Sequence, residues 1–338
     1  MEAIAPNLEI IFRTASNQYQ QLLNSTGTWY TQLATPFPSS TRQNVFAWMD
    51  RIPILRKWVG ERVVNAAATH SRTATNEPFE LTLDLDKFDI EDDQLGLFTF
   101  GVQNMGMQAA KWPDQRVAKW LTTTTTGQGN EGASITNSFD GVPQFSTAHP
   151  LLGGDVVGQA NGGQGGNLNT SGTQSNLAVS TALSFDAYVS ARTTMMSWLG
   201  ADGQPLNINP NLLVVPPALE GTARAILNSD FLPSTSGQGF STAPGQAPIT
   251  NTYKGSAQLL VIPELATKPA NWYLFDNTKV VKPFIWMLRT APIFTARTAP
   301  TDPVVFDTHK FRYGIEARGT ALESLWFLSY AGTSNASY

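Results

Sequence analysis

Residues 203–227 read GQPLNINPNLLVVPPALEGTARAIL, and this stretch decides much of the fold. Four consecutive apolar residues, Leu212–Val215, are typical of a short strand. Two prolines follow at once, and a proline is favourable at the first position of a helix, which we expect to run to Leu227. This strand-to-helix unit matches no catalytic template.

A second informative stretch, Asp84–Thr122, begins with the acidic sequence DLDKFDIEDD at residues 84–93. Asp89 or Asp92 can cap a helix there, because carboxylates are favourable at a helix N-terminus. We expect one long helix over residues 91–122, with an apolar face formed by Phe98, Val102, Met105, Ala109, Trp112, Val117, Trp120 and Leu121. The carboxylates leave a metal-dependent hydrolase as an alternative, although the glycine and glutamate of a calcium loop are missing from their places.

The composition favours a subunit that neighbours cover. Charged residues make up 14% of the 338 residues, against roughly 25% in an average soluble domain, and interface cores are depleted in charge. The net charge is −4, and no run of Lys or Arg is present to grip a nucleic-acid backbone. The absence of cysteine excludes disulfides and thiolate metal sites. No signal peptide or membrane span is evident, so we expect no membrane partner. No sequence motif for a cofactor or a metal ion is evident either, and we expect neither.

Two segments near the N-terminus predict elements that must pack on another surface, an amphipathic helix and a two-stranded arm. Asn7 caps an amphipathic helix that should end near residues 24–27, followed by extended chain. Residues 45–82 suggest a two-stranded arm, with Val59–Asn65 leading out, a polar tip at Thr69–Asn76 and Pro78–Leu85 returning as a half-buried strand. An isolated hairpin is marginal in water, so this arm should lie on another subunit.

The remaining sequence alternates loops with short elements. Residues 122–180 and 233–250 read as polar loops, and Ser184 should cap a helix that runs to Trp198. Further strands are expected at Gln258–Ile262, Trp272–Phe275, Val280–Leu288, Ile293–Ala296, Val304–Phe306, Lys310–Glu316 and Trp326–Tyr330.

The three histidines, His70, His149 and His309, lie in unrelated settings, which argues against a two-histidine metal site. His149 precedes a proline, and we expect it to bond backbone groups in a turn. No G-x-S-x-G elbow and no P-loop lysine is present. The sequence therefore offers no catalytic residues.

Six blocks in order carry a specific resemblance. They read IEDDQLGLF, AAKWPDQRVAKWL, DGVPQFSTAHP, LSFDAYVSARTTMMSWLGADGQPLNINPNLLVVPPALEGTARAIL, NWYLFDNTKVVKPFIWMLRTAPIFTA and FRYGIEARGTALESLWFLSYAG. Together they span nearly the whole chain. The sequence resembles the Mu-like phage major head subunits, the gpT-type branch of the HK97-like major capsid proteins.

This resemblance implies an α+β fold with a known map. Residues 1–44 would be the N-terminal arm, and residues 45–82 would be the extended loop, or E-loop, which overlaps a neighbour. Residues 83–180 and 279–338 would form the peripheral domain around the long spine helix. Residues 181–278 would form the axial domain, whose loops meet at the five-fold and six-fold centres.

The implied function is a major capsid protein that self-assembles as pentamers and hexamers into an icosahedral shell around double-stranded DNA of a tailed phage. Portal, separate scaffold or protease, and decoration proteins are the implied partners, with assembly in the host bacterial cytoplasm and a final place in the virion. An encapsulin-like cellular shell protein shares the implied fold and is the alternative. Candidate inter-subunit contact residues are Trp48, Arg51, Arg56, Trp58, Arg62 and Phe79.

Overall fold

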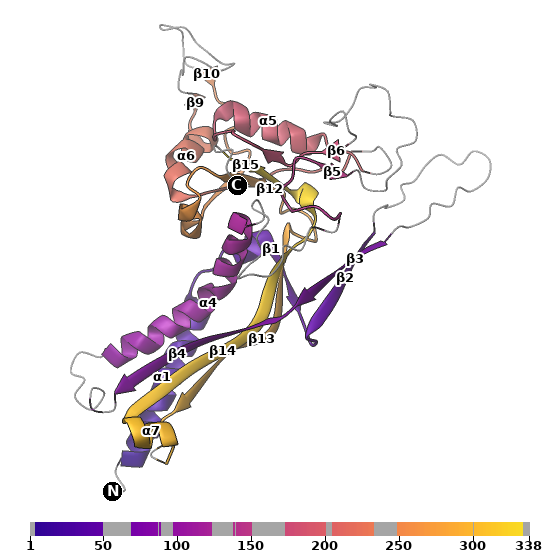
Figure 1. Ribbon diagram of the computed structural model, residues 1–338. Coiled ribbons are helices and arrows are strands. Elements are labelled where there is room, and N and C mark those ends of the chain that lie inside the picture. The colour runs from indigo at the N-terminus through magenta and orange to yellow at the C-terminus, as the bar shows by residue number, and fades with distance from the viewer. Residues whose placement is uncertain are drawn as a thin grey trace.

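The computed structural model describes a two-sheet α+β molecule (Figure 1). The described residues are 4–49, 69–86, 88, 97–123, 138, 140–150, 173–200, 205–232, 249–299 and 301–333. A four-stranded sheet with two long helices forms the elongated lower part, and a five-stranded sheet with shorter helices forms the upper part.

The lower sheet has the strand order β1-β13-β14-β4. Its centre is a long antiparallel ribbon of β13 (Phe284–Arg297) and β14 (Lys310–Glu323). Strand β1 (Ala34–Pro38) runs parallel to β13, and β4 (Glu77–Asp86) runs antiparallel to β14. Alternate residues of β14 are buried, as expected for a sheet with one covered face.

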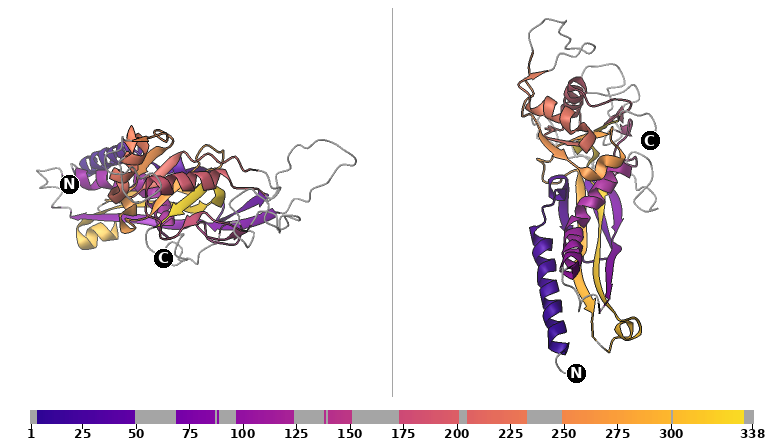
Figure 2. Two further views of the ribbon diagram at one scale, coloured as in Figure 1. Left: turned by 90° about the horizontal axis from the view of Figure 1, so that it is seen from above. Right: turned by 90° about the vertical axis from the view of Figure 1, so that its left-hand side faces the viewer.

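Two helices cover one face of this sheet. Helix α4 (Leu97–Thr123) is the long helix expected from the sequence, and α1 (Ile4–Ser25) lies alongside it (Figure 2). Ala15 and Tyr19 of α1 pack with Val102 and Met105 of α4 over the β14 side chains. The N-terminal helix therefore docks on its own subunit, and α2 (Tyr30–Leu33) then leads into β1.

The upper sheet has the order β11-β8-β12-β15-β7, and β8 (Leu212–Val215) is one of its inner strands. The strand predicted at Leu212–Val215 is confirmed, and all four of its residues are buried, as is typical of a strand covered on both faces. Leu213 and Val215 pack with helices α5 (Phe185–Met196) and α6 (Glu220–Asn228). Leu212 and Val214 pack on the opposite side with the C-terminal part of α4, so one strand joins two cores.

The other strands of this sheet are β11 (Gln258–Val261), β12 (Trp272–Phe275), β15 (Ser329–Gly332) and β7 (Leu177–Ala178). Two of these strands, β7 and β15, therefore lie in a different sheet from the one that the implied domain division suggests. Strands β7 and β15 were expected in the peripheral domain, but they pair with β12 or with each other in the upper sheet. The cause is long-range pairing, which a linear division cannot anticipate.

Several short elements complete the described chain. The 3-10 helices η2 (Pro217–Leu219) and η3 (Pro263–Thr267) flank α6 and β11 in sequence. The two-stranded pairs are β5 (His149–Pro150) with β6 (Thr173–Gln174), and β9 (Phe231–Leu232) with β10 (Ile249–Thr250). Ser184 caps α5 by accepting a hydrogen bond from the Ala187 amide at 3.1 Å, which confirms the predicted start of that helix.

Three strand predictions need correction. Val304–Phe306 lies in helix α7 (Pro303–Thr308), because Asp302 caps the Val304 amide and Pro303 starts the first turn, which outweighs β-branched propensity. The two strands expected over residues 280–296 are one strand, β13, with register shifts between Leu288 and Ile293. Residues 326–330 divide into the 3-10 helix η4 (Trp326–Leu328) and β15.

The predicted arm is a hairpin, but its tip was placed wrongly. Residues Thr69–Thr75 form strand β3, which pairs with β2 (Gln43–Met49), so they are one limb of the hairpin. Thr69, Thr73 and Thr75 favour a strand, because threonine is β-branched, and this explains why a polar stretch is extended here. The limb expected at Val59–Asn65 lies outside the described residues. The returning strand predicted at Pro78–Leu85 is confirmed as β4, which belongs to the lower sheet.

Candidate functional site

The root of the β2–β3 hairpin is fixed to the body by a buried ion pair. Arg72 of β3 pairs with Glu323 at the end of β14, and the two side chains are 9% and 1% exposed. The Arg72 guanidinium also lies 5.9 Å from the centre of the Trp120 ring in α4. Burial raises the pKa of the Glu323 carboxyl, and Arg72 opposes that rise through its charge and hydrogen bonding. Separation of this pair would leave a buried charge without compensation.

Polar and apolar contacts surround this ion pair. The Asn76 side chain donates hydrogen bonds to Ser39 Oγ at 2.8 Å and to the Thr41 carbonyl at 2.9 Å. Ala74, two residues from Arg72 and on the same face of β3, packs with Ile285, Met287 and Leu322 of the lower sheet. The hairpin therefore leaves the body from a defined root at residues 72–76.

Phe79 lies just beyond this root, at the start of β4. Its ring centre is 5.1 Å from that of Trp112, and the Arg116 guanidinium lies 4.6 Å from the Phe79 ring centre. Arg116 also forms an ion pair with Glu77 at 3.0 Å. Phe79 is half-buried and lines a cleft of about 370 Å³ between α4 and the lower sheet. It contributes to the subunit interior and also faces this cleft.

Two of the six candidate contact residues lie in described strands, and the other four do not. Trp48 lies on β2, where its backbone pairs with His70 of β3, and Phe79 lies on β4. Arg51, Arg56, Trp58 and Arg62 lie outside the described residues. The structure therefore describes two of the six, and the role of all six as contacts stays a prediction.

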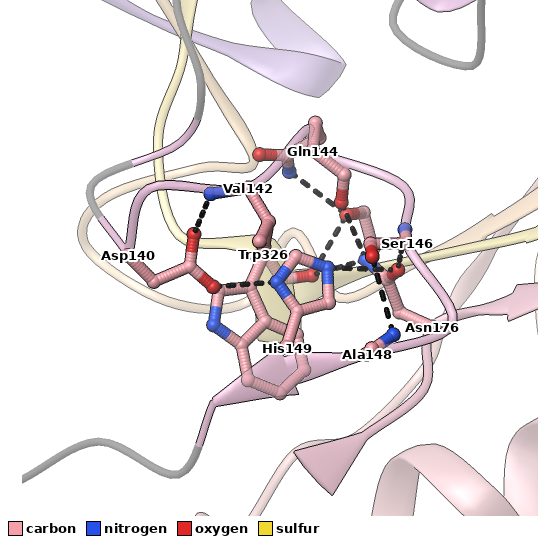
Figure 3. A network of polar contacts seen from close by, with 9 residues as sticks. Asp140, Val142, Gln144, Ser146, Ala148, His149, Asn176 and Trp326 are labelled. Carbon is pink, nitrogen blue, oxygen red and sulfur yellow. Dashed lines mark hydrogen bonds and ion pairs between the residues drawn. The ribbon is translucent and has the colours of Figure 1, made fainter. Parts of the chain in front are cut away.

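His149 of β5 belongs to a buried polar network (Figure 3). Its Nδ1 lies 2.5 Å from Asp140 Oδ2, and its Nε2 lies 3.1 Å from Asn176 Oδ1. The ring stacks on Trp326 with centroids 4.2 Å apart and planes 6° from parallel. The expectation of a histidine that bonds backbone groups in a turn was wrong, because two side chains distant in sequence converge on the ring.

In the described part of the acidic segment, Asp84 forms an ion pair within the lower sheet. Both carboxylate oxygens of Asp84 accept hydrogen bonds from Arg312, at 2.6 and 2.7 Å, across β4 and β14. Hydrogen bonding to Arg312 lowers the pKa of the Asp84 carboxyl. Asp89 and Asp92, the predicted caps, lie outside the described residues. Within the described part of the chain, no three His, Asp or Glu side chains converge as metal ligands.

Sequence reasoning missed Arg72, Glu323, Asp140 and Asn176. One signal was available for the first of these, because Arg72, Ala74 and Asn76 share one face of an alternating strand. No signal was available for Asp140 and Asn176, since loop sequences carry no periodicity. Among the described helices, none combines the length and apolar character that crossing a membrane requires.

The two-sheet fold, with its long helix and projecting hairpin, is that of a phage capsid subunit. The structure aligns with a TM-score of 0.53 and 25% identity to the procapsid of bacteriophage JBD30, over 97% of this chain and 75% of that chain. It also aligns to the JBD30 capsid with a TM-score of 0.50 and 25% identity, over 71% and 92% of the two chains. The mature capsid of bacteriophage PhiM1, at 12% identity and a TM-score of 0.50, shares the fold.

The family follows from sequence comparison. The model of the Mu-like prophage major head subunit gpT matches residues 8–175, 166–265 and 266–337. The chain belongs to this family. It is 25% identical over 305 residues to the major capsid protein of Escherichia phage Mu, covering 75% of this chain and 97% of that protein.

A second relative is the Mu-like prophage FluMu major head subunit of Haemophilus influenzae, which is 28% identical over 159 residues, 47% of this chain and 48% of that protein. The chain is accordingly a major head subunit with the HK97-like fold, a structural component of a tailed-phage capsid. The family match favours this function over an encapsulin-like compartment and over a hydrolase.

Proposed function

We propose that copies of this subunit form pentamers and hexamers, which close into an icosahedral shell around double-stranded DNA. The β2–β3 hairpin carries this proposal. It diverges from the lower sheet above its root (Figure 1), and Val45 on β2 is 66% exposed. A two-stranded ribbon buries too little apolar surface to be stable alone, so a neighbouring subunit is its natural support.

Contacts of this kind join different surfaces of identical subunits. Such heterologous contacts close into rings when the rotation between copies returns to the start. In this proposal the hairpin is the extended loop that lies on the next subunit. Its contact residues, with one from the neighbouring strand, are Trp48, Arg51, Arg56, Trp58, Arg62 and Phe79.

The proposed domain map follows the sheets. The lower sheet with α4 is the peripheral domain, and the upper sheet with α5 and α6 is the axial domain at the capsomer centre. The approximate limits are those of the sequence, residues 83–180 with 279–338 and residues 181–278. Strands β7 and β15 are assigned to the axial sheet, because they hydrogen-bond within it.

The shell is proposed to enclose DNA without reading its sequence. The net charge of −4 and the absence of a basic run suit a wall along which packed DNA can slide. Further proposed partners are a portal, a separate scaffold or protease, and a decoration protein outside the shell. Assembly is proposed in the host bacterial cytoplasm, and the subunit is proposed to have no catalytic activity.

The test is electron microscopy of the purified chain and of the variant Arg56→Glu/Arg62→Glu. The parent should form closed shells, or rings of five and six subunits, in the presence of any scaffold required. The charge-reversed variant should remain folded by circular dichroism and fail to form shells. The matched control is Arg56→Lys/Arg62→Lys, which keeps both positive charges and should assemble.

Normal shells from the charge-reversed variant would remove these arginines from the contact set. Nuclease-protected DNA inside shells from infected cells would support the viral role. A protein cargo in place of DNA would instead favour a cellular compartment.

A further inference from the structure

The two outer strands of the lower sheet differ in what their free edges offer to another strand. Within the described residues, the sheet ends at β1 on one side and at β4 on the other. The Ser39 amide, which follows β1, donates to the Leu288 carbonyl of β13 at 2.9 Å. Because strand residues alternate in direction, the backbone nitrogen atoms at positions 36 and 38 face outward. Both residues are prolines, which have no N–H, so the β1 edge offers no donor to a further strand.

The edge of β4 has no such protection. This strand spans ten residues, Glu77–Asp86, and pairs with β14 along its whole length. Its one proline, Pro78, lies near its start, so residues 79–86 keep every backbone N–H. Alternate residues direct their N–H and C=O groups away from β14, and within the described part of the chain no backbone hydrogen bond joins this edge to another segment. A long open edge of this kind is a template for a strand from another chain.

The cleft between α4 and the lower sheet adjoins this edge. Phe79, Glu80 and Leu81 of β4 line the cleft, and Leu81 is 38% exposed although it is a large apolar side chain. A strand added along β4 would run past this hollow, and its side chains on that face can enter it. Strand addition characteristically combines main-chain hydrogen bonds, which give affinity, with side-chain pockets, which give specificity.

The charge of the β4 edge favours a basic partner strand. The strand has no Lys or Arg and carries four carboxylates, those of Glu77, Glu80, Asp84 and Asp86. Glu80 also lies directly opposite Glu316 of β14, and both are exposed. The described residues form no ion pair with either of these two carboxylates, and like charges in opposite positions destabilise a sheet. A second copy of β4 would increase this repulsion, whereas a cationic side chain would offset it.

A basic segment continues from the end of the β2–β3 hairpin. The last described pair of the hairpin is Met49 with Thr69, and residues 50–68 join these two positions. The joining sequence is DRIPILRKWVGERVVNAAA, and its four basic and two acidic residues give it a net charge of +2. Within it, Val59–Asn65 is rich in valine and contains Arg62, a composition that favours a basic strand.

We propose that β4 receives Val59–Asn65 of a neighbouring copy as an added strand. Successive side chains of a strand point to opposite faces, so Arg62 can lie beside Glu80 and Glu316 while Val63 enters the cleft. The partner is a second copy because β4 and the hairpin leave the hairpin root in opposite directions (Figure 1). The proposal rests on the proposed function, since it names the surface on which the continuation of the hairpin lies.

The first experiment tests strand addition on dilute subunits of the full chain. A fluorescent peptide of residues 50–68 should bind the parent saturably in an anisotropy titration. Two further peptides carry N-methyl groups on alternate amides, one at Val59, Glu61 and Val63 and the other at Gly60, Arg62 and Val64. Only one set of amides faces β4, so one methylated peptide should bind about tenfold more weakly, or worse, and the other should bind like the unmodified peptide. No binding by the parent, or equal binding of the two methylated peptides, would overturn the proposal.

The second experiment tests whether β4 is the receiving strand. Glu80→Lys/Glu316→Lys should remain folded by circular dichroism and bind the unmodified peptide about tenfold more weakly. The milder change Glu80→Gln should weaken binding in the same direction. The matched control is Glu220→Lys/Asp230→Lys, which makes the same change in net charge at two exposed carboxylates of the upper part and should leave binding unchanged. Equal affinities for all variants would overturn the assignment of β4, as would binding of a peptide of residues 77–86, which would indicate that β4 pairs with itself.

The third experiment is a charge exchange in assembly. Arg56→Glu/Arg62→Glu, which should form no shells alone, should recover them when it is combined with Glu80→Lys/Glu316→Lys. Shells that stay absent in the combined variant would place these arginines against another surface and would overturn the proposal. Failure of the parent to form shells would count only against the proposed function, because the peptide measurements need no assembly. Normal parent shells without peptide binding would count only against the role of β4.

Discussion

Gly106 of α4 lies directly against the carbonyl oxygen of Tyr19 in α1, so that a Cβ at Gly106 would sit 2.8 Å from that oxygen. The same tyrosine stacks on Phe294 of β13 with ring centroids 5.0 Å apart. Its hydroxyl donates to the Pro292 carbonyl at 3.3 Å. These contacts seat the N-terminal helix on the body of its own subunit, because only glycine permits so close a helix–helix approach.

Substitution of this glycine should loosen the helix. Gly106→Ala should lower the free energy of unfolding by ~1–3 kcal/mol, because the added methyl group meets rigid backbone. Chemical denaturation would measure this change. The control is Gly221→Ala in α6, where an added Cβ meets nothing within 4 Å. That variant should be stabilised by up to ~1 kcal/mol, since alanine is the better helix former.

Asp114 should make stability depend on pH. Its Oδ1 accepts hydrogen bonds from the Trp29 and Tyr30 amides, at 3.0 and 2.8 Å, and so ties α4 to the start of α2. Burial raises the pKa of this carboxyl from 3.8 to about 6, although the two amides oppose the rise. The folded protein therefore holds a proton that the unfolded chain releases. The resulting stabilisation is complete below pH 3.8 and is lost as the pH rises through about 6.

Asp114→Asn keeps an oxygen acceptor but cannot ionise. From the shift in the Asp114 pKa, the variant should gain up to about 3 kcal/mol relative to the parent as the pH rises through this window. Urea denaturation at a series of pH values would measure the difference. Asp230→Asn, which removes an exposed carboxylate paired with Lys254, is the control. A constant difference between Asp114→Asn and the parent would contradict the pKa assignment.

The buried pair at the hairpin root should behave asymmetrically. Arg72→Met alone leaves the Glu323 carboxylate buried and unpaired, and should cost ~3–5 kcal/mol of stability. Arg72→Met/Glu323→Leu removes both charges and should recover most of that loss. A double-mutant cycle measured by thermal and urea denaturation gives the coupling. Additive effects of the two single changes would show that the residues do not interact.

Phe79 should contribute to the isolated subunit as well as to any contact between subunits. Phe79→Ala removes the packing on Trp112 and the contact with Arg116, and should cost ~2 kcal/mol in the monomer. The control is Phe306→Ala on α7, a side chain that is 76% exposed and should change stability by less than ~0.5 kcal/mol. If monomer stability is unchanged but shell yield falls, Phe79 acts only between subunits.

Local sequence signals were accurate where the physical cause is local. The Ser184 cap, the buried run Leu212–Val215 and the helix after Pro216 were all placed correctly from a few neighbouring residues. The error at Val304–Phe306 has the same origin. Asp302 and Pro303 are local helix signals, and they outweigh the strand preference of the valines.

Long-range pairing was not accessible in this way. The hairpin limb Thr69–Thr75 was taken for a tip, because its register with β2 depends on residues far along the chain. The place of β7 and β15 in the upper sheet has the same cause. Backbone hydrogen bonds between strands carry no side-chain signature, so a sequence can predict a strand without predicting its partner.

The sequence by itself determined the class of this protein. Its low charge, its lack of cysteine and catalytic motifs, and six ordered blocks were sufficient for a head subunit with a long helix and a projecting arm. Only the tertiary structure decided that Arg72 meets Glu323 and that His149 meets Asp140 in buried contacts. The energy of a charge depends on its surroundings in space, and only folding brings the partners of each pair together.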